Sequence, residues 1–362
     1  MGDGEDAALI DYVREIRAAL PAEVFAPARS RIAWLPVHLA IIVAAMLTIA
    51  SGVGGWPVAL ACSLVLGMSF AGLSFLGHEV LHGAVLRGRT AIQVVGWICF
   101  SPFLLSPRLW IAWHNRAHHG NTMAKGVDPD AYPTLEAYRQ SFALRLVTSV
   151  FSLGRRSPLG FTSLLIGFTV QSAHMLFAAR SAVGMSPARH RVALAQSGLA
   201  AAMWITLAFV LGPLGFVFAY VIPLLIANVM VMSYILTNHS LSPLTDENDP
   251  LLNSLSVTTP RWYSFLTLDF GMHVEHHLLP AMSTRHAGRV REVLQARWPE
   301  RYQSMPLGRA VWQLMRTARV YRDDTTLHDP WTGRDWPAIL PRPIATASAA
   351  ANAAAPSTLS AS

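Results

Sequence analysis

Residues 67–82 read GMSFAGLSFLGHEVLH, and this stretch joins two patterns that recur separately along the chain. Its first part completes an uncharged segment that begins at Ile32 and ends at Gly77. Its last part places His78 and His82 four positions apart, which puts both side chains on one face of a helix. The stretch therefore predicts a membrane helix that ends in a pair of imidazoles.

Two segments of the 362-residue chain, 32–77 and 192–245, contain no Asp, Glu, Lys or Arg. A helix needs about 20 apolar residues to cross a bilayer core of about 30 Å. Residues 192–236 as one helix would measure about 67 Å at about 1.5 Å per residue, which is too long for one span. Glycine-rich turns near the middle divide both segments. The predicted spans are 33–50, 57–77, 192–211 and 215–236.

We therefore expect an all-α, polytopic membrane protein with four transmembrane helices in two hairpins and a helical cap. The hairpin turns carry no arginine and every other loop carries several, so the positive-inside rule places the cap in the cytoplasm. Charged residues make up 14% of the chain and hydrophobic residues 52%, which excludes an ordinary soluble or disordered protein. The +7 net charge then reflects loops beside a lipid bilayer, and we expect no nucleic acid partner.

Two shorter uncharged stretches, 90–107 and 157–179, contain proline, glutamine or histidine. The histidines on either side of them must meet on one face of the membrane, so we expect both stretches to lie in the interface or to re-enter. Cys62 and Cys99 are the only cysteines, which excludes a disulfide scaffold and an iron–sulfur cluster.

The chain divides into three predicted parts. Residues 1–30 form an amphipathic helix with a lead-in; its acidic start is unlike a signal peptide, and its apolar positions suit the cap or the bilayer surface. Residues 31–335 form the membrane domain. Residues 336–362 form an Ala/Ser/Pro-rich tail that we expect to be disordered.

Nine of the fourteen histidines fall in four short places, and their spacing puts the members of each place on one helix face. Imidazole suits Fe, Zn, Cu and Ni, and eight or nine such ligands exceed what one ion takes, so we expect two metal ions. The candidate ligands are His78, His82, His114, His118, His119, His239, His273, His276 and His277. The other five histidines, expected to be structural or solvated, are His38, His174, His190, His286 and His328.

One alternative uses part of the same residues. His78-Glu79-Val80-Leu81-His82 also matches HExxH, in which two histidines bind zinc and the glutamate is the general base of a protease. Asp269 is the candidate third ligand. That interpretation leaves the histidines at 114–119 and 273–277 unexplained, so we expect Glu79 instead to orient a ligand imidazole.

The boxes HEVLH, HNRAHH and HVEHH resemble the membrane fatty acid desaturase family, over roughly residues 30–320. The resemblance implies four transmembrane helices below a cytoplasmic cap that holds two iron ions. His239 corresponds to an extra histidine that some members place before the final box, and Asn238 beside it is assigned a water-bridging role. The three residues between His78 and His82 point toward the acyl-lipid branch. The similarity to bacterial acyl desaturases implies the bacterial inner membrane.

The resemblance also implies an O2-dependent reaction that introduces a C=C bond into a fatty acyl chain. A hydroxylase, a carotenoid ketolase or an alkene-forming fatty acid decarboxylase would use the same scaffold. Trp110, Trp113 and Phe270 are candidates to line the acyl channel. Electrons must come from a separate donor, such as ferredoxin or a cytochrome, since the sequence has no nucleotide-binding GxGxxG after a strand. Candidate arginines for an acidic carrier are Arg285, Arg289, Arg291, Arg297 and Arg301.

Overall fold

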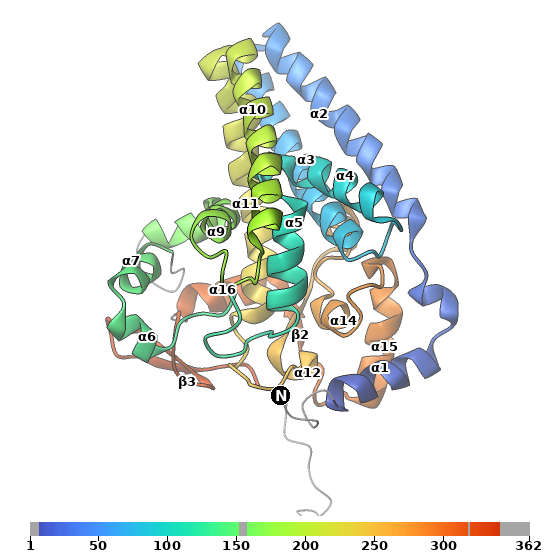
Figure 1. The fold of residues 1–362 in the computed structure, drawn as a ribbon, viewed down its shortest axis with the longest axis vertical. Coiled ribbons are helices and arrows are strands. Elements are labelled where there is room, and N and C mark those ends of the chain that lie inside the picture. The colour runs from blue at the N-terminus through green and yellow to red at the C-terminus, as the bar shows by residue number, and fades with distance from the viewer. Residues whose placement is uncertain (1–6, 152–157, 318, 341–362) are drawn as a thin grey trace, which may run out of the picture.

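The computed structural model describes residues 7–151, 158–317 and 319–340, and these residues are mostly helical. The molecule tapers from a broad base to a narrow end, at the top of Figure 1. Four long helices converge on the narrow end and the shorter elements make up the base. The long helices are α2 (Trp34–Ser51), α3 (Gly55–Leu81), α10 (Pro187–Phe216) and α11 (Ile222–His239).

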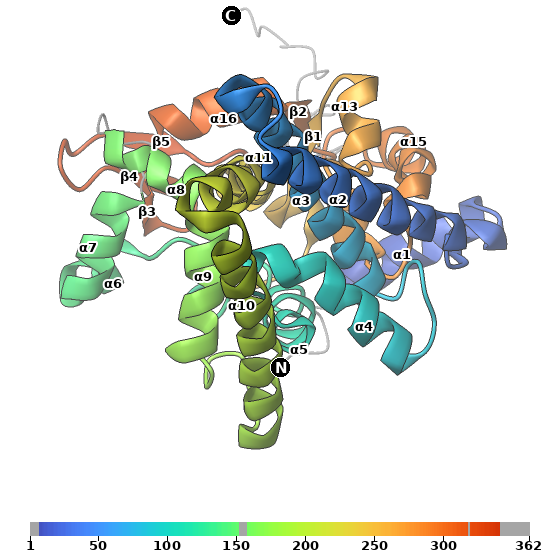
Figure 2. The same ribbon diagram turned by 90° about the horizontal axis from the view of Figure 1, so that it is seen from above.

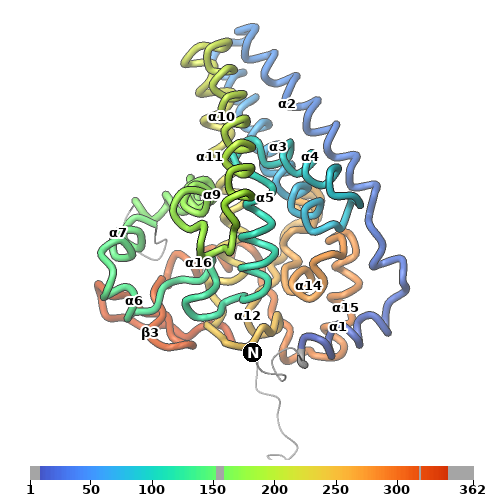
Figure 3. Tube along the Cα trace, in the orientation of Figure 1, coloured from blue at the N-terminus to red at the C-terminus, as the bar shows by residue number. Residues whose placement is uncertain are grey.

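Among the described residues, three helical runs are long and apolar enough to cross a membrane: Arg29–Ser51, Gly55–Leu81 and Pro187–His239. The number rises to five if each of the two bent helix pairs described below is one span. The third run has 53 residues and includes α10, the π-helical segment η6 (Val217–Val221) and α11. Gly212 interrupts it with φ 69° and ψ 172°, a conformation outside the helical region that only glycine adopts at low cost. In Figure 3 the chain rises in α10 and descends in α11.

α3 is the central helix, because it packs against both α2 and α11. Glycines allow the close approach. A Cβ atom on Gly67 would lie 2.6 Å from Cβ of Ile226 in α11, and one on Gly72 would lie 2.4 Å from the ring of His38 in α2. Small residues at such contacts let helix backbones come together without a void. The packing fixes where α3 and α11 end.

Both shorter apolar stretches are bent. Arg89–Phe103 and Pro107–His118 meet at 98°, and Leu159–Leu165 and Gly167–Phe177 meet at 76°. A pair bent in this way is either a broken span or a re-entrant loop, so the location of these stretches in the interface or as re-entrant segments stays a prediction. Their elements are α4 (Arg89–Phe100), η3 (Ser101–Phe103), α5 (Pro107–Trp110), η4 (Ile111–His118), η5 (Pro158–Phe161), α8 (Thr162–Leu165) and α9 (Gly167–Phe177).

The base contains a second apolar core beside the helices of the narrow end. In it α1 (Ala7–Ala19) packs on α14 (His273–Leu278) and α15 (Ala287–Arg297) through buried Tyr12 and Ile16. The amphipathic N-terminal helix thus lies against the cap. Further helical elements are η1 (Ala22–Phe25), η2 (Arg29–Ala33), α6 (Leu135–Gln140), α7 (Phe142–Val150), α12 (Pro250–Asn253), α13 (Arg261–Leu266), η7 (Thr284–His286) and α16 (Leu307–Arg316).

The all-α prediction omitted five short strands. β1 (Ser256–Thr258) pairs in parallel with β2 (Ser304–Pro306), near α13 and α15 in Figure 2. An antiparallel sheet has the order β3-β4-β5, with β3 at Val320–Asp323, β4 at Thr326–His328 and β5 at Asp335–Pro337. Segments of three or four residues are too short to show a period-two pattern.

The start of the predicted tail is also corrected. Residues 336 and 337 belong to β5, and the backbone N–H groups of Ala338 and Ile339 donate to the carbonyls of Thr325 and Leu241. Residues 336–340 are therefore part of the folded base. The rest of the predicted tail, 341–362, lies outside the described residues.

Candidate metal centre

The two central helices deliver histidines to one place. His78 lies in the last turn of α3, His82 follows directly after that helix, and His239 is the last residue of α11. Because α3 and α11 pack together, their ends lie side by side. α3 therefore positions His78 and His82, as residues 67–82 predict, and α11 positions His239 beside them.

The second box lies on η4, which is π-helical rather than α-helical. A π-helix bonds residue i to i+5, and the backbone N–H of His119 donates to the carbonyl of His114. The Nε2 atoms of His114 and His119 lie 3.2 Å apart. The predicted pairing of His114 with His118 on one α-helical face is therefore corrected, and His118 turns to a different group of histidines.

All nine predicted histidines come together, in two adjoining groups. His276 of α14 joins the first group and His273 and His277 join the second, so the third box contributes to both. Nε2 of His119 lies 3.1 Å from Nε2 of His276, which places it with the first group. The first histidine group is His78, His82, His114, His119 and His276. The second histidine group is His118, His239, His273 and His277.

The distances within each group suit metal ligands. Nε2 of His78 is 3.1 Å from Nε2 of His114, and Nε2 of His273 is 2.7 Å from that of His239 and 3.0 Å from that of His277. Nitrogen ligands at about 2.1 Å from one ion are about 3 Å apart when they occupy neighbouring positions. The Nε2 atom of His82 is buried and without a hydrogen-bond partner in the described structure. The residues therefore fit two nitrogen-ligated ions.

Burial keeps these imidazoles neutral. Burial and the neighbouring histidines His78 and His82 hold the pKa of His276 well below its usual value. Burial and the neighbours His119 and His273 do the same for the pKa of His277. A neutral imidazole keeps a free lone pair, so His276 and His277 can bind metal without first losing a proton at neutral pH.

His118 is different because two carboxylates face it. Its Nδ1 donates to Oδ1 of Asp128 at 3.0 Å, and Oδ2 of Asp130 lies 3.5 Å away. Burial lowers the pKa of His118, but Asp128 and Asp130 outweigh that effect and raise the pKa to about 9. A carboxylate on Nδ1 fixes the ring orientation and leaves Nε2 for a metal.

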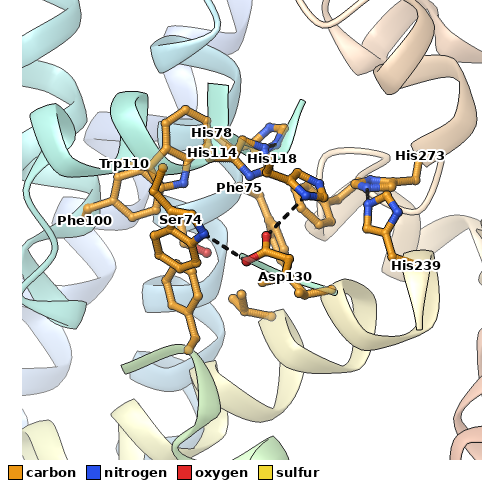
Figure 4. A pocket seen from close by; sticks show the side chains of 15 residues that line it. Ser74, Phe75, His78, Phe100, Trp110, His114, His118, Asp130, His239 and His273 are labelled. Atoms are coloured by element: carbon orange, nitrogen blue, oxygen red, sulfur yellow. Dashed lines mark hydrogen bonds and ion pairs between the residues drawn. The ribbon is translucent and has the colours of Figure 1, made fainter. Parts of the chain in front are cut away.

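The sequence analysis missed these two aspartates. Both are buried behind the second box, and Asp130 also accepts from Nε1 of Trp113 at 2.9 Å and from Nε2 of Gln171 at 2.6 Å. Their one sequence signal is position: Asp128-Pro129-Asp130 follows the histidine box within about a dozen residues. Figure 4 shows Asp130 with a dashed line to His118, and both side chains line the cavity described below.

Two further contacts orient ligands of the second group. Nδ1 of His239 donates to the carbonyl of Asn253 at 3.1 Å, which leaves its Nε2 atom directed to His273. The hydroxyl of Thr122 lies 3.3 Å from Nδ1 of His277. Side-chain amide atoms of Asn238 are buried without a partner in the described structure, so its predicted water-bridging role stays a prediction.

Glu79 does not orient an imidazole, and that prediction is corrected. Its Oε1 atom accepts from Oγ of Ser283 at 2.9 Å and from the backbone N–H and Oγ1 of Thr284 at 2.7 and 2.6 Å. Nε of Arg31 lies 3.8 Å from its other oxygen. The carboxylate therefore anchors α3 to the loop before η7.

The same contacts disfavour the protease alternative. A general base must reach the bound water, but Oε1 of Glu79 accepts from Ser283 and Thr284, and Oε2 faces Nε of Arg31 at 3.8 Å. Asp269, its candidate third ligand, binds Nη2 of Arg31 at 2.9 Å and belongs to neither histidine group.

An apolar cavity adjoins both histidine groups. Trp110, Trp113 and Phe270 line it, as predicted for an acyl channel. Figure 4 labels Trp110 among the lining side chains. Its wall also contains Phe75 from α3 and Val231 from α11, so the central helices bound it as well. A long apolar ligand would thus reach the histidines through a hydrophobic passage.

The five remaining histidines stay outside the two groups. His190 pairs with the carbonyl of Leu176, and His328 with Asp335. Three of the five arginines predicted to receive an acidic carrier already form ion pairs within the chain: Arg291 with Glu275, Arg297 with Glu15 and Arg301 with Asp249. These ion pairs hold the base together.

The site combines helices apolar enough to span a membrane, two groups of histidines that could hold metal ions, and an apolar cavity beside them. A model of the family described as fatty acid desaturase matches residues 54–308, so the chain belongs to the fatty acid desaturase family. It is therefore an oxidoreductase that desaturates fatty acyl chains.

Similar curated proteins are acyl-lipid and chloroplast desaturases. The sn-1 acyl-lipid omega-3 desaturase (ferredoxin) of Synechocystis is 26% identical over 83% of this chain and 86% of its own length. The sn-1 oleoyl-lipid 12-desaturase of Arthrospira platensis is 24% identical over 74% of this chain and 77% of its own length. The chloroplastic omega-6 fatty acid desaturase of Spinacia oleracea is 22% identical over 84% and 68%.

Proposed function

We propose that this chain is an acyl-lipid desaturase that holds two iron ions and uses O2 to place a C=C bond in a lipid acyl chain. One observation carries the proposal: two adjoining groups of buried and half-buried histidines face an apolar cavity lined by aromatic side chains. The names of the curated relatives support an acyl-lipid substrate.

The nine histidines would hold the ions, one at each group. When bound, iron supplies the oxidising chemistry, in which O2, two electrons and two protons are consumed, two hydrogens leave adjacent methylenes and two waters form. Phe270 and Trp110 confine the acyl chain next to His78 and His114. Positioning one C–C bond of a flexible chain is the protein's main contribution, because proximity alone lowers such barriers by several kcal/mol (roughly 7–11 in favourable cases).

The protein's own polar groups have supporting tasks. Asp128 holds His118 in one orientation, and the carbonyl of Asn253 holds His239. Phe75, Phe100 and Phe168 exclude water from the cavity next to the histidines. A dry site protects a reactive centre from side reactions.

We propose that the chain crosses the bacterial inner membrane four times, with the histidines on the cytoplasmic side. Gly212 supports two crossings within Pro187–His239, because its φ of 69° breaks the helix near the middle of the run. The arginine-free turns at both hairpin tips support the orientation. A separate carrier supplies electrons, and the ferredoxin in one relative's name favours that carrier.

The test is lipid analysis after expression in a bacterium that lacks the product. We expect the full chain to yield acyl chains of unchanged carbon number with two fewer hydrogens, measured by gas chromatography and mass spectrometry. His276→Ala should abolish the product, whereas His286→Ala, outside both groups, should retain it. A product that has gained oxygen or lost a carbon would overturn the proposed reaction.

A further inference from the structure

A second, polar cavity lies beyond the turn that carries Phe270. Phe270 lines the histidine cavity, whereas its neighbours Asp269 and Gly271 line this other cavity, which has about 710 Å³ of open space. Leu268 and Asp269 hold the turn in the left-handed region, with φ of 53° and 60°. One short turn therefore separates the two cavities.

Two arginines border the polar cavity with unused donors. Arg291 donates through Nε to Glu275 at 3.0 Å and to the hydroxyl of Tyr302 at 2.7 Å, but its Nη2 is buried and has no partner in the described structure. Arg261, the first residue of α13, is exposed and makes no hydrogen bond or ion pair within the described residues. Nη2 of Arg291 therefore lacks an acceptor and the charge of Arg261 lacks a counter-ion, and an anion would satisfy both.

The carboxylates beside these arginines are already engaged. Asp269 accepts from Nη2 of Arg31 at 2.9 Å and from Oγ of Ser264 at 2.8 Å. Glu275 is fully buried and accepts from Ser256 and Tyr302, both at 2.6 Å, in addition to Arg291. Neither carboxylate contacts Arg261, so the cavity keeps a free cationic side.

The cavity also lies next to the start of α2, where the first predicted membrane span begins. Phe265 lines the cavity and contacts Trp34, the first residue of α2, with ring centroids 5.0 Å apart. On the same helix α13, Trp262 is 64% exposed and Phe265 61% exposed. Exposed aromatic residues at the end of a membrane helix mark the headgroup region of a bilayer.

We propose that the polar cavity binds the phosphate of a glycerophospholipid, with Arg261 and Arg291 as its ligands, while an acyl chain of that lipid occupies the histidine cavity. The proposal rests on the proposed function and adds the headgroup class to it. A guanidinium group binds phosphate through two parallel charge-assisted hydrogen bonds, which suits Arg261, and Nη2 of Arg291 offers one further donor. The adjoining cavities would let one lipid reach from the headgroup level to the histidines.

The test compares two lipids with identical acyl chains, dioleoyl phosphatidylglycerol and dioleoylglycerol, on the purified full chain by native mass spectrometry. We expect the phospholipid to bind about tenfold more tightly, as one charge-assisted contact provides. Arg261→Gln should remove that preference and Arg261→Lys should restore part of it. Arg289→Ala, an exposed arginine on α15 outside the cavity, should leave it unchanged.

Equal binding of the two lipids, or an unchanged preference in Arg261→Gln, would overturn the headgroup site. Competition by glycerol 3-phosphate at the concentration of the lipid would show a site for soluble phosphate and would overturn the lipid assignment. Desaturase assays on the same samples keep the two proposals apart. If both lipids bind equally well and are desaturated equally fast, the proposed function stands and the headgroup site is wrong. If the phospholipid binds more tightly but no desaturated product forms, the headgroup site stands and the proposed function is wrong.

Discussion

Nδ1 of His118 donates to Oδ1 of Asp128 across 3.0 Å, with both side chains buried. The carboxylate is itself held, because its oxygens accept from the backbone N–H groups of Met123 at 2.7 Å and Asp130 at 2.9 Å. The loop after the second box thus fixes the ring of one candidate ligand. Such partners commonly contribute as much to metal retention as the ligands' own geometry.

Asp128→Asn should therefore weaken metal binding without unfolding the chain. The amide keeps the size of the carboxylate but loses its charge, so we expect metal affinity to fall by about 10- to 100-fold. Metal content after dialysis against graded chelator would measure the change. Asp246→Asn, at an exposed position, is the control; equal metal retention in both variants would remove Asp128 from the site.

The two histidine groups predict two separable metal ions. His276→Ala removes a member of the first group and His277→Ala a member of the second, so each should lower the metal content by about one ion per chain. Inductively coupled plasma mass spectrometry on the purified protein gives the stoichiometry. His286→Ala should retain both ions. A single ion in the unmodified chain, or a metal content that His276→Ala leaves unchanged, would contradict the dinuclear arrangement.

Gly67→Ala should destabilise the contact between α3 and α11. The new methyl group would lie 2.6 Å from Cβ of Ile226 and 3.1 Å from the carbonyl of Pro223, and overpacking of this kind costs about 1–3 kcal/mol. Thermal unfolding in detergent should show a lower midpoint. Gly198→Ala in α10 meets no atom within 4 Å, so it should be neutral or slightly stabilising. A midpoint unchanged by Gly67→Ala would contradict this tight packing.

Glu79 should matter for stability rather than for chemistry. Glu79→Ala would leave the buried donors of Ser283 and Thr284 without their acceptor, and removal of a buried, hydrogen-bonded charge costs about 3–5 kcal/mol. Glu79→Gln retains one acceptor oxygen and should keep its full metal content. Glu292→Gln, on the exposed side of α15, controls for the loss of a charge. Metal loss in Glu79→Gln with unchanged unfolding would point to a direct role at the metal.

The sequence predicts the outline of the fold because charge-free segments and their turns are strong, local signals. The helix pairs at 32–77 and 192–236 follow from them. The small strands do not, since β1 pairs Ser256 with Ser304 and depends on tertiary contacts between distant segments.

The candidate metal centre is likewise only partly predictable from the sequence. Histidine spacing indicates which residues gather, but the division of His114 and His118 between two groups depends on one π-helical turn, which has no mark in the sequence. The partners of Glu79 lie about 205 positions away along the chain, so no local pattern indicates them. Asp128 and Asp130 look like any loop carboxylates until the fold buries them behind His118.

The ends of α3 and α11 meet at the histidines, and α14 of the base meets them there. Each histidine group includes residues from the long apolar helices and residues from the base. Ions bound at the two groups would therefore cross-link the long helices to the base. The free energy of metal binding would then add to the free energy of unfolding. A cell short of iron would then hold less of the assembled protein and lose the rest to proteolysis, so iron supply would set the amount of enzyme as well as its activity.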